Sequence, residues 1–262
     1  MPFDYKKECK DIYQPSKKPA LIEMPPINYV AVRGKGDPNE EGGEYRRALQ
    51  MLYGISFTIK MSPKSGYDIE GYAPYVVPPL EGFWTFPEPI ERLDPKRKAE
   101  LEWISCIRLL EFVTPGVFDW AVQEATRKKK ADFSKAEMIT VDEGLCVQCM
   151  HIGSYDDEPA TIDALRGYVE SEGMRFDQSK KRLHHEVYLS DPRRVAPERL
   201  KTVIRIPVKP AQGGRASNGQ GLGEARTRQA PGARTREACR ALHQARRTRH
   251  RSAPPSTPPG SR

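Results

Sequence analysis

The sequence predicts an α+β domain made of two similar halves, followed by a basic tail. Hydrophobic periodicity and turn residues mark a strand, a helix and two strands in succession, and the same order appears twice within residues 28–207. All 22 aromatic residues occur before residue 211, which separates the domain from the tail. We therefore divide the 262 residues into an N-terminal lead-in (1–17), a pseudo-twofold domain (18–210) and a tail (211–262).

The first half opens with a strand and a helix. Residues 28–33 alternate and are rich in strand-forming side chains, which predicts a strand that ends at Gly34. Asp37 and Pro38 then predict a helix start, because Asp is a favoured N-cap and proline fits the first turn. Helical spacing places the buried stripe of this helix at Tyr45, Leu49, Leu52, Tyr53 and Ser56.

Three segments assigned as strand complete the first half. Residues 67–77 and 83–86 are rich in strand-forming side chains, and Pro78-Pro79 separates them. Residues 100–113 contain both helix-like and strand-like signals, and we assign them as strand.

The second half repeats the pattern. Residues 115–130 predict a helix whose last three residues are lysines, at the end where cations suit the helix dipole. A strand, a second helix that ends at Gly173, and two further strands follow. Their predicted ranges are residues 145–152, 156–172, 183–189 and 202–207.

The tail differs in composition from the domain. Residues 1–210 carry a net charge of −1, whereas residues 211–262 contain 11 Arg, two Glu and no Lys. Because the tail has few large apolar side chains, we expect it to be disordered. The domain contains 18 Lys, so the absence of lysine indicates out-of-frame or recently appended coding sequence. The alternatives are an unselected linker and a basic arm that makes weak, non-specific nucleic-acid contacts.

Several protein classes are excluded. No apolar run is long enough to span a membrane, and the N-terminus lacks the apolar stretch of a secretory signal. Five cysteines are an odd number in a chain of this size, which indicates reduced thiols in a cytoplasmic protein. The chain has no phosphate loop, HExxH or GxSxG motif, which argues against nucleotide hydrolysis, zinc proteolysis and serine-esterase chemistry. The sequence does not predict an oligomeric state.

Residues 183–189, LHHEVYL, carry the most informative candidate site. With a side-chain period of two, His184, Glu186 and Tyr188 share one face of the predicted strand. A carboxylate in the middle of such a strand is costly to bury unless it is paired, protonated or used. The alternative is a solvated face, since antiparallel sheets often have one wet side.

Two cysteine and histidine patterns are weaker candidates. Cys146 and Cys149 form a CxxC pair, but no second pair exists for a zinc site, and on a strand their sulfurs point to opposite faces. We interpret both as structural cysteines. A metal site formed by His151, His184 and Glu186 is conceivable, but the sequence provides no evidence for that geometry. We predict no metal and no cofactor.

The chain contains three tryptophans, at positions 84, 103 and 120. Tryptophans usually fill cores. Together with the 11 tyrosines of the chain, three of them could also form the walls of a flat aromatic pocket.

Four stretches resemble a known family: KPALIEMPPINYVAVRGKGDPNE, FVTP, EGLCVQCMHIGSYDDEPATI and HHEVYLSDPRRVAPERLKTVIRIPV. Between about Lys18 and Pro210 the chain resembles the GyrI-like small-molecule-binding family. More narrowly, it resembles the stand-alone branch associated with hydrolysis of cyclopropane-bearing genotoxins of the yatakemycin and duocarmycin type. The resemblance implies two SHS2-type units around a central ligand cleft, which agrees with the repeat described above.

The resemblance also implies roles for particular residues. The acidic residue that the family buries in the strand before SDP corresponds to Glu186, which would activate the attacking water. A tyrosine hydroxyl, from Tyr168 or Tyr188, would hydrogen-bond the substrate oxygen as it gains charge. The expected catalytic residues are therefore Glu186 and Tyr168, and the expected ligand-binding residues are Trp84, Trp103, Tyr188 and His184.

The expected partner is a planar aromatic small molecule, and the expected function is detoxification by a cofactor-independent cyclopropanoid hydrolase. A non-catalytic module that binds drugs or effectors is an alternative, because aromatic walls around one buried acid also hold flat cations. A gyrase inhibitor-like interaction protein is a third interpretation, and nothing in the near-neutral domain favours it. The sequence does not identify the natural substrate.

Overall fold

The computed structural model describes residues 1–88 and 95–211, so the predicted tail lies almost entirely outside the described residues. Within this range nine strands form an antiparallel sheet in the order β1-β6-β9-β8-β3-β4-β2-β5, and β7 pairs with β9. The strands are β1 (Ala20–Met24), β2 (Ile27–Lys35), β3 (Leu80–Thr85), β4 (Glu102–Arg108), β5 (Glu137–Val141), β6 (Gly144–Ile152), β7 (Met174–Phe176), β8 (His184–Tyr188) and β9 (Lys201–Pro210).

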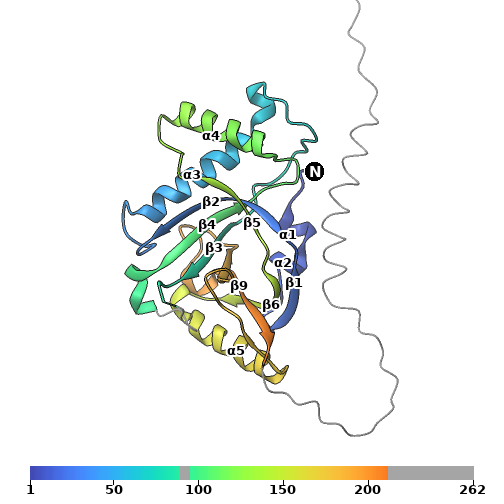
Figure 1. The fold of residues 1–262 in the computed structure, drawn as a ribbon, viewed down its shortest axis with the longest axis vertical. Coiled ribbons are helices and arrows are strands. Elements are labelled where there is room, and N and C mark those ends of the chain that lie inside the picture. The colour runs from blue at the N-terminus through green and yellow to red at the C-terminus, as the bar shows by residue number, and fades with distance from the viewer. Residues whose placement is uncertain (89–94, 212–262) are drawn as a thin grey trace, which may run out of the picture.

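Helices pack at both ends of the curved sheet. Figure 1 shows α3 and α4 together at one end and α5 at the other, with the strands between them. The described part of the chain contains no helix that is both long and apolar enough to cross a membrane. The α-helices are α1 (Tyr5–Glu8), α2 (Lys10–Tyr13), α3 (Glu44–Lys60), α4 (Pro115–Lys129) and α5 (Glu158–Ser171). The 3-10 helices are η1 (Ser62–Ser65), η2 (Pro95–Glu100), η3 (Tyr155–Asp157) and η4 (Pro197–Arg199).

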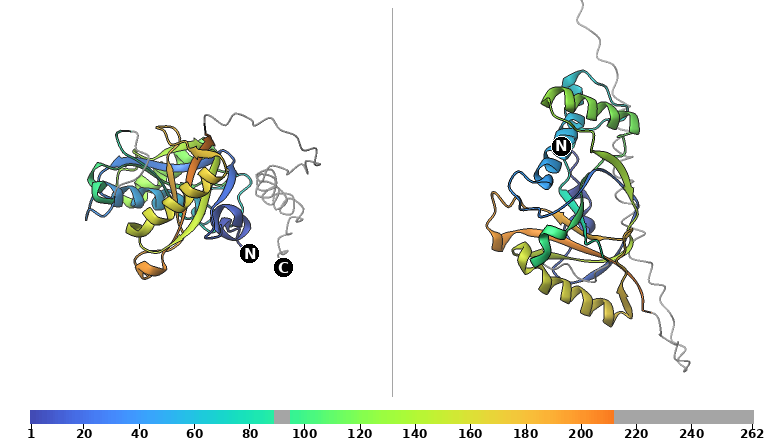
Figure 2. Two further views of the ribbon diagram at one scale, coloured as in Figure 1. Left: turned by 90° about the horizontal axis from the view of Figure 1, so that it is seen from below. Right: turned by 60° about the vertical axis from the view of Figure 1, so that its left-hand side comes forward.

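The predicted internal repeat is confirmed by the topology. One half is β2–α3–β3–β4 and the other is β6–α5–β8–β9, and the two meet where β3 pairs with β8 at the centre of the sheet. Helix α3 packs on β2 and β4, whereas α5 packs on β6 and β7. The strands β3 and β8 therefore lie between the two helix-covered regions. The right-hand view of Figure 2 shows the blue and green helices at one end of the sheet and the yellow helix at the other.

The apolar residues form two cores. The larger one includes residues from α3, α4 and the strands β2, β3 and β4. The smaller one lies beneath α5 and includes strand residues such as Cys149 and Ile204. Cys146 belongs to the larger core and Cys149 to the smaller, so the two sulfurs lie on opposite faces of β6, and both thiols are free.

Some predicted boundaries were wrong. Helix α3 begins at Glu44 instead of Pro38, because Gly42 adopts a left-handed φ of 68° and Gly43 is the N-cap. Strand β3 begins at Leu80, directly after the double proline, and so is longer than predicted.

Residues 67–77 contain no named strand, in contrast to the prediction. Gly66 and Gly71 have φ values of 73° and 75°, which interrupts an extended conformation. The backbone near Tyr75 pairs instead with the N-terminus, through bonds from Phe3 N to Pro74 O and from Val76 N to Phe3 O.

The N-terminal residues, expected to lead into the domain, are part of its core. Phe3, Tyr5, Ile12 and Tyr13 are buried in the larger apolar cluster. The Tyr13 hydroxyl donates to Glu81 and the Ile12 carbonyl oxygen accepts from Arg205, so α2 lies against the sheet face opposite to the one that carries Glu186.

Candidate active site

Strand β8 presents two different polar faces, as its side-chain period of two predicts. His184, Glu186 and Tyr188 face the side of the sheet that carries α3 and α5. Glu186 lies at the centre, and its carboxylate is hydrogen-bonded to both neighbours. Glu186 is 6% exposed, so the solvated-face interpretation of this strand is wrong.

Glu186 is held by two protein groups. The Tyr188 hydroxyl donates to Oε2 at 2.8 Å, and His184 Nε2 lies 3.0 Å from Oε1. The Trp84 indole N–H donates in turn to the Tyr188 oxygen at 2.8 Å. Burial and the nearby Glu186 raise the pKa of Tyr188, so its proton stays on the phenol and points at Glu186. Donors of this kind favour the ionised form of a carboxylate.

Gly82 has no side chain and so leaves room above the central strands. In the sheet register Gly82 lies opposite Glu186 on one side and opposite Ser105 on the other. A Cβ at this position would lie 2.7 Å from Trp84 Nε1 and 3.1 Å from the Tyr188 hydroxyl. Glycine therefore allows the indole and the phenol to meet above β3, beside the Glu186 carboxylate.

Aromatic side chains from both halves surround this group. Tyr45 of α3 contacts Trp84 with ring centroids 5.6 Å apart and meets Trp103 edge-on at 5.1 Å. Tyr155 of η3 meets Tyr188 edge-on at 5.8 Å. Burial, followed by the Glu186 charge, raises the pKa of Tyr155 to about 12. The site is thus enclosed by rings contributed near the N-terminal ends of α3 and α5.

Trp103 supports the site from the neighbouring strand. Its indole lies over Gly34, where an added Cβ would come within 2.3 Å of the ring. Its Nε1 is buried without a hydrogen-bond partner. Buried donors of this kind are uncommon and are enriched where ligands or waters bind.

A second carboxyl, Glu158, completes the site, and the sequence analysis missed it. Glu158 is the first residue of α5 and is 7% exposed, and its Oε1 has no hydrogen-bond partner. Polar atoms of Glu158, His184 and Glu186 lie within 4.8 Å of one another. Burial, followed by the charge of Glu186, raises the pKa of Glu158 well above its usual value.

The sequence does contain a signal for Glu158. The inward face of α5 carries Ile162, Leu165 and Val169, and Glu158 precedes them at the same helical spacing. An acid that continues an apolar stripe is expected to be buried. The acidic run at residues 156–158 concealed this, because acids at a helix start are also explained by the dipole.

The cluster of Glu158, His184 and Glu186 has the spacing of a cation site. However, both Glu186 oxygens already accept protein hydrogen bonds, so we describe the three side chains as an acid–base group. The set considered from the sequence, with His151 in place of Glu158, is not assembled.

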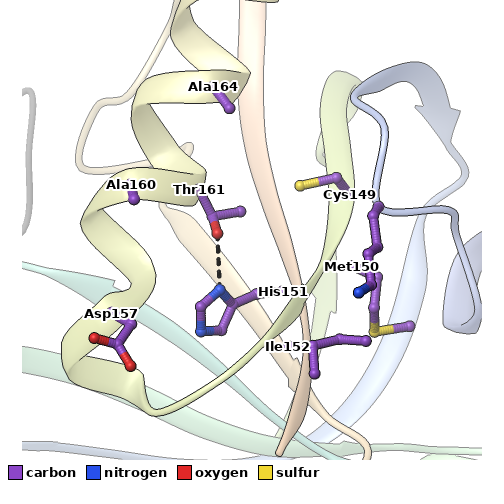
Figure 3. Close-up of a pocket in the computed structure, with 9 residues that line it drawn as sticks. Cys149, Met150, His151, Ile152, Asp157, Ala160, Thr161 and Ala164 are labelled. Atoms are coloured by element: carbon purple, nitrogen blue, oxygen red, sulfur yellow. Dashed lines mark hydrogen bonds between the residues drawn. The ribbon is translucent and has the colours of Figure 1, made fainter. Parts of the chain in front are cut away.

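His151 lies in a separate cavity of about 390 Å³ between β6 and α5 (Figure 3). Its Nδ1 is 2.7 Å from the Thr161 hydroxyl and its Nε2 is 2.9 Å from the Ser154 carbonyl oxygen. Because a carbonyl only accepts, Nε2 carries the proton and Nδ1 accepts from Thr161. Both ring nitrogens are satisfied, as in a structural histidine.

Five of the six predicted site residues lie together around Glu186, and Tyr168 lies apart from them. It is half-buried against the smaller core beneath α5. It follows Glu158 by ten residues, which is about 15 Å along a helix axis. The structure brings Trp84, His184 and Tyr188 into one bonded chain with Glu186, and it places Trp103 beside them through Tyr45.

A cavity of about 350 Å³ adjoins this group and is lined on one side by Trp84 and His184. This volume is at the lower end of the range for small-molecule pockets. Its other lining residues include the cationic side chains of Arg166, Arg175, Lys180, Arg182 and Lys209.

The opposite face of β8 carries a second buried polar network. His185 Nδ1 and Nε2 each lie 3.0 Å from a carboxylate, Glu143 and Glu81 respectively. Arg205 Nη1 also lies 3.2 Å from His185 Nδ1. The two carboxylates favour the imidazolium form, and the pKa of His185 is raised although burial acts to lower it. Arg205 Nη1 also reaches Glu143 at 3.4 Å. Hydroxyls of Tyr13 and Tyr29 donate to Glu81 at 3.2 and 3.0 Å.

Comparison with known proteins agrees with this architecture. Residues 17–209 match the family described as the GyrI-like small molecule binding domain. This chain belongs to the GyrI-like family. The resemblance inferred from the sequence is thereby confirmed at family level, over almost the same residues.

Solved structures of Listeria innocua proteins are similar to this GyrI-like domain. One, an uncharacterized conserved protein, is 43% identical with a TM-score of 0.74, over 79% of this chain and 100% of its own. Two others, each described as a hydrolase, are 41% and 42% identical, with TM-scores of 0.72 and 0.73. They cover 79% and 80% of this chain and 100% of their own. A comparison with curated proteins finds no match.

Proposed function

We propose that this protein binds flat aromatic or hydrophobic small molecules beside Glu186 and hydrolyses cyclopropane-bearing genotoxins by Glu186-assisted attack of water. The proposal is supported by the small-molecule-binding family and by similar proteins described as hydrolases. The observation that carries it is a buried carboxylate held by two donors and surrounded by aromatic rings from both halves.

The substrate class explains why so few groups are needed. In these genotoxins a cyclopropane is fused to a planar dienone, and ring opening makes the ring system aromatic. Stacking against aromatic walls would orient the planar ligand and exclude bulk water. The protein then has to provide an oriented water and stabilise the charge that develops on the dienone oxygen.

Glu186 is the proposed general base. Its carboxylate removes a proton from water as the water oxygen attacks the cyclopropane carbon. General-base assistance of this kind typically contributes about 10²–10⁴-fold to the rate. Tyr188 and His184 orient the carboxylate, because both are hydrogen-bonded to it. The Tyr188 proton is committed to Glu186, and Tyr168 lies too far along α5 to contact the same substrate atoms, so we assign neither hydroxyl to the dienone oxygen.

The test is a single-turnover incubation with a duocarmycin-type cyclopropane, followed by mass spectrometry. Wild type is expected to form a product heavier by one water, and Glu186→Gln is expected to bind the substrate but lose most turnover. Binding is followed by quenching of tryptophan fluorescence. Unchanged substrate that still quenches fluorescence would instead make the protein a non-catalytic binder. Loss of binding and turnover together in Glu186→Gln would contradict the role of Glu186 as a base.

A further inference from the structure

Glu158 is a buried acid that the proposed reaction has not yet used. Burying a carboxylate is costly unless it is paired, and Glu158 Oε1 has no hydrogen-bond partner, while the carboxyl group as a whole is hydrogen-bonded to Glu186. A carboxyl in this position is stable when it is neutral, or when a cationic group pairs with it.

The surroundings of the two carboxyl groups differ. Glu186 accepts hydrogen bonds from Tyr188 and from His184, which stabilise its charge. Glu158 faces the negative charges of Glu186 and Asp156, and the nearby cation, Lys98, is bound to Asp156 at 2.8 Å. Position at the start of α5 favours a carboxylate, but this effect is smaller than the cost of burying one. Burial and these negative charges therefore keep Glu158 neutral.

We propose that Glu158 is a second catalytic residue, a neutral carboxylic acid that gives its proton to the substrate oxygen, and that the Glu158–Glu186 pair also hydrolyses aryl epoxides. This inference rests on the proposed function in one respect, namely that Glu186 is the base that activates water. The substrate class follows from this pair of carboxyl groups. Opening an epoxide ring breaks a carbon–oxygen bond, which needs a base to activate the water and an acid to protonate the departing oxygen.

The epoxide reaction balances without any further reactant. Glu186 takes one proton from water, the water oxygen bonds to an epoxide carbon, and the carbon–oxygen bond on the other side of that carbon breaks. The electron pair of that bond goes to the oxygen, which takes the Glu158 proton. The products are a diol, a protonated Glu186 and an ionised Glu158. Transfer of the proton from Glu186 to Glu158 across the pair restores the starting state.

Acid assistance matters more for an epoxide than for a cyclopropanoid. The departing epoxide oxygen would leave as an alkoxide, whereas the dienone oxygen becomes a phenolate, which is a far weaker base. Proton donation contributes more when the oxygen that gains charge is the stronger base. Loss of the Glu158 proton should therefore impair the two reactions unequally.

The experiment compares styrene oxide with a duocarmycin-type cyclopropane in wild type, Glu158→Gln and Glu186→Gln. Glu170→Gln is the matched control, because it makes the same change at an exposed position of α5. Wild type and the control should convert both substrates. In Glu158→Gln the rate of epoxide turnover should fall at least about 100-fold, and the rate of cyclopropane turnover only about tenfold. Glu186→Gln should lose turnover of both substrates.

The outcomes separate the two proposals. Cyclopropane turnover without epoxide turnover overturns this inference and leaves the proposed function intact, whereas turnover of neither overturns both. Equal epoxide turnover by wild type and Glu158→Gln removes the role of Glu158. A readout independent of turnover is the infrared carbonyl band of a protonated carboxylic acid at neutral pH, present in wild type and Glu170→Gln and lost in Glu158→Gln. Its absence from wild type also overturns the inference. If Glu158→Gln does not fold, wild type alone decides: the ratio of epoxide to cyclopropane turnover must fall as the pH rises.

Discussion

His185 and Glu186 are adjacent in β8, yet each lies in a different buried network on opposite faces of the sheet. Glu186 belongs to the acid–base group between α3 and α5. His185 bridges Glu81 and Glu143 beneath the N-terminal helices. The His185 network therefore anchors the strand that carries the proposed base, and a change in one network is expected to affect the other through the backbone of β8.

We expect loss of the His185 charge to destabilise the fold. Removing one partner of a buried ionic group typically costs about 3–5 kcal/mol, because the remaining charges are left uncompensated. His185→Gln should lower the free energy of unfolding by about this amount, measured by urea denaturation at pH 6. A loss below about 1 kcal/mol would contradict the ionic description of the network.

The same network predicts how stability depends on pH. Burial acts to lower the pKa of His185, but the charge of Glu143 and the hydrogen bonds to Glu143 and Glu81 together outweigh it, and the pKa is raised. The stability from His185 is then fully present below its unfolded value of about 6.5 and is lost as the pH rises through the folded value. Burial acts to raise the pKa of Glu143, but the charges of His185 and Arg205 and their hydrogen bonds to it together outweigh burial and lower the pKa. Stability from Glu143 is present above its unfolded value and is lost as the pH falls through the folded one. The free energy of unfolding, measured across the pH range, should fall toward both acid and alkaline pH. His185→Gln should reduce the fall on the alkaline side.

A third prediction concerns the glycine at the centre of the site. Gly82→Ala adds a Cβ that would lie 2.7 Å from Trp84 Nε1, so the indole must shift and its bond to Tyr188 must lengthen. We expect ligand binding to weaken by at least about tenfold, which is the effect of about 1.4 kcal/mol. Gly167→Ala on α5 is the control, since nothing lies within 4 Å of its Cβ, and it should stabilise the helix by about 0.5–1 kcal/mol. Unchanged fluorescence titration of Gly82→Ala would show that the space above Gly82 is not used.

Much of the fold was predictable because local patterns and topology agree. The alternation around Glu186 correctly placed three polar side chains on one face of β8, and the repeat of strand and helix signals predicted the two halves. The N-terminal helices were not predictable, because α1 and α2 have only four residues each and depend on packing against the sheet. The region near Tyr75 was mispredicted because glycine conformations and pairing with Phe3 override its strand-forming composition.

The candidate site was predictable in part, for a different reason. Residues on one strand share a face by geometry alone, which is why His184, Glu186 and Tyr188 were grouped correctly. Glu158 and Tyr45 lie on helices of different halves. No pattern in the sequence predicts how closely these two helices approach each other. Tyr168 was favoured as a tyrosine near the expected cleft, but its place along α5 separates it from Glu186.

A fourth prediction concerns the tail. We expect removal of residues 212–262 to leave activity and solubility unchanged. The alignment with the Listeria innocua protein that is 43% identical spans all of that protein but only 79% of this chain. The family match ends at residue 209. Turnover and the concentration that remains soluble should be compared between the two lengths. A loss of either in the shorter chain would assign the tail a working role.

The last prediction isolates the hydroxyl that holds the proposed base. Tyr188→Phe removes the donor to Glu186 Oε2 and the acceptor of the Trp84 N–H, while it keeps the ring that meets Tyr155. A hydrogen bond to a charged group contributes about 1.5–3 kcal/mol, so ionised Glu186 loses roughly that stabilisation. Because the carboxylate is then held less firmly in position, the maximal rate of cyclopropane hydrolysis should fall by at least about tenfold. Binding of the planar ligand should change little, since the stacking surface is kept. If binding of the planar ligand weakens as much as the maximal rate falls, Tyr188 would contact the substrate directly, and the dienone oxygen would be its partner.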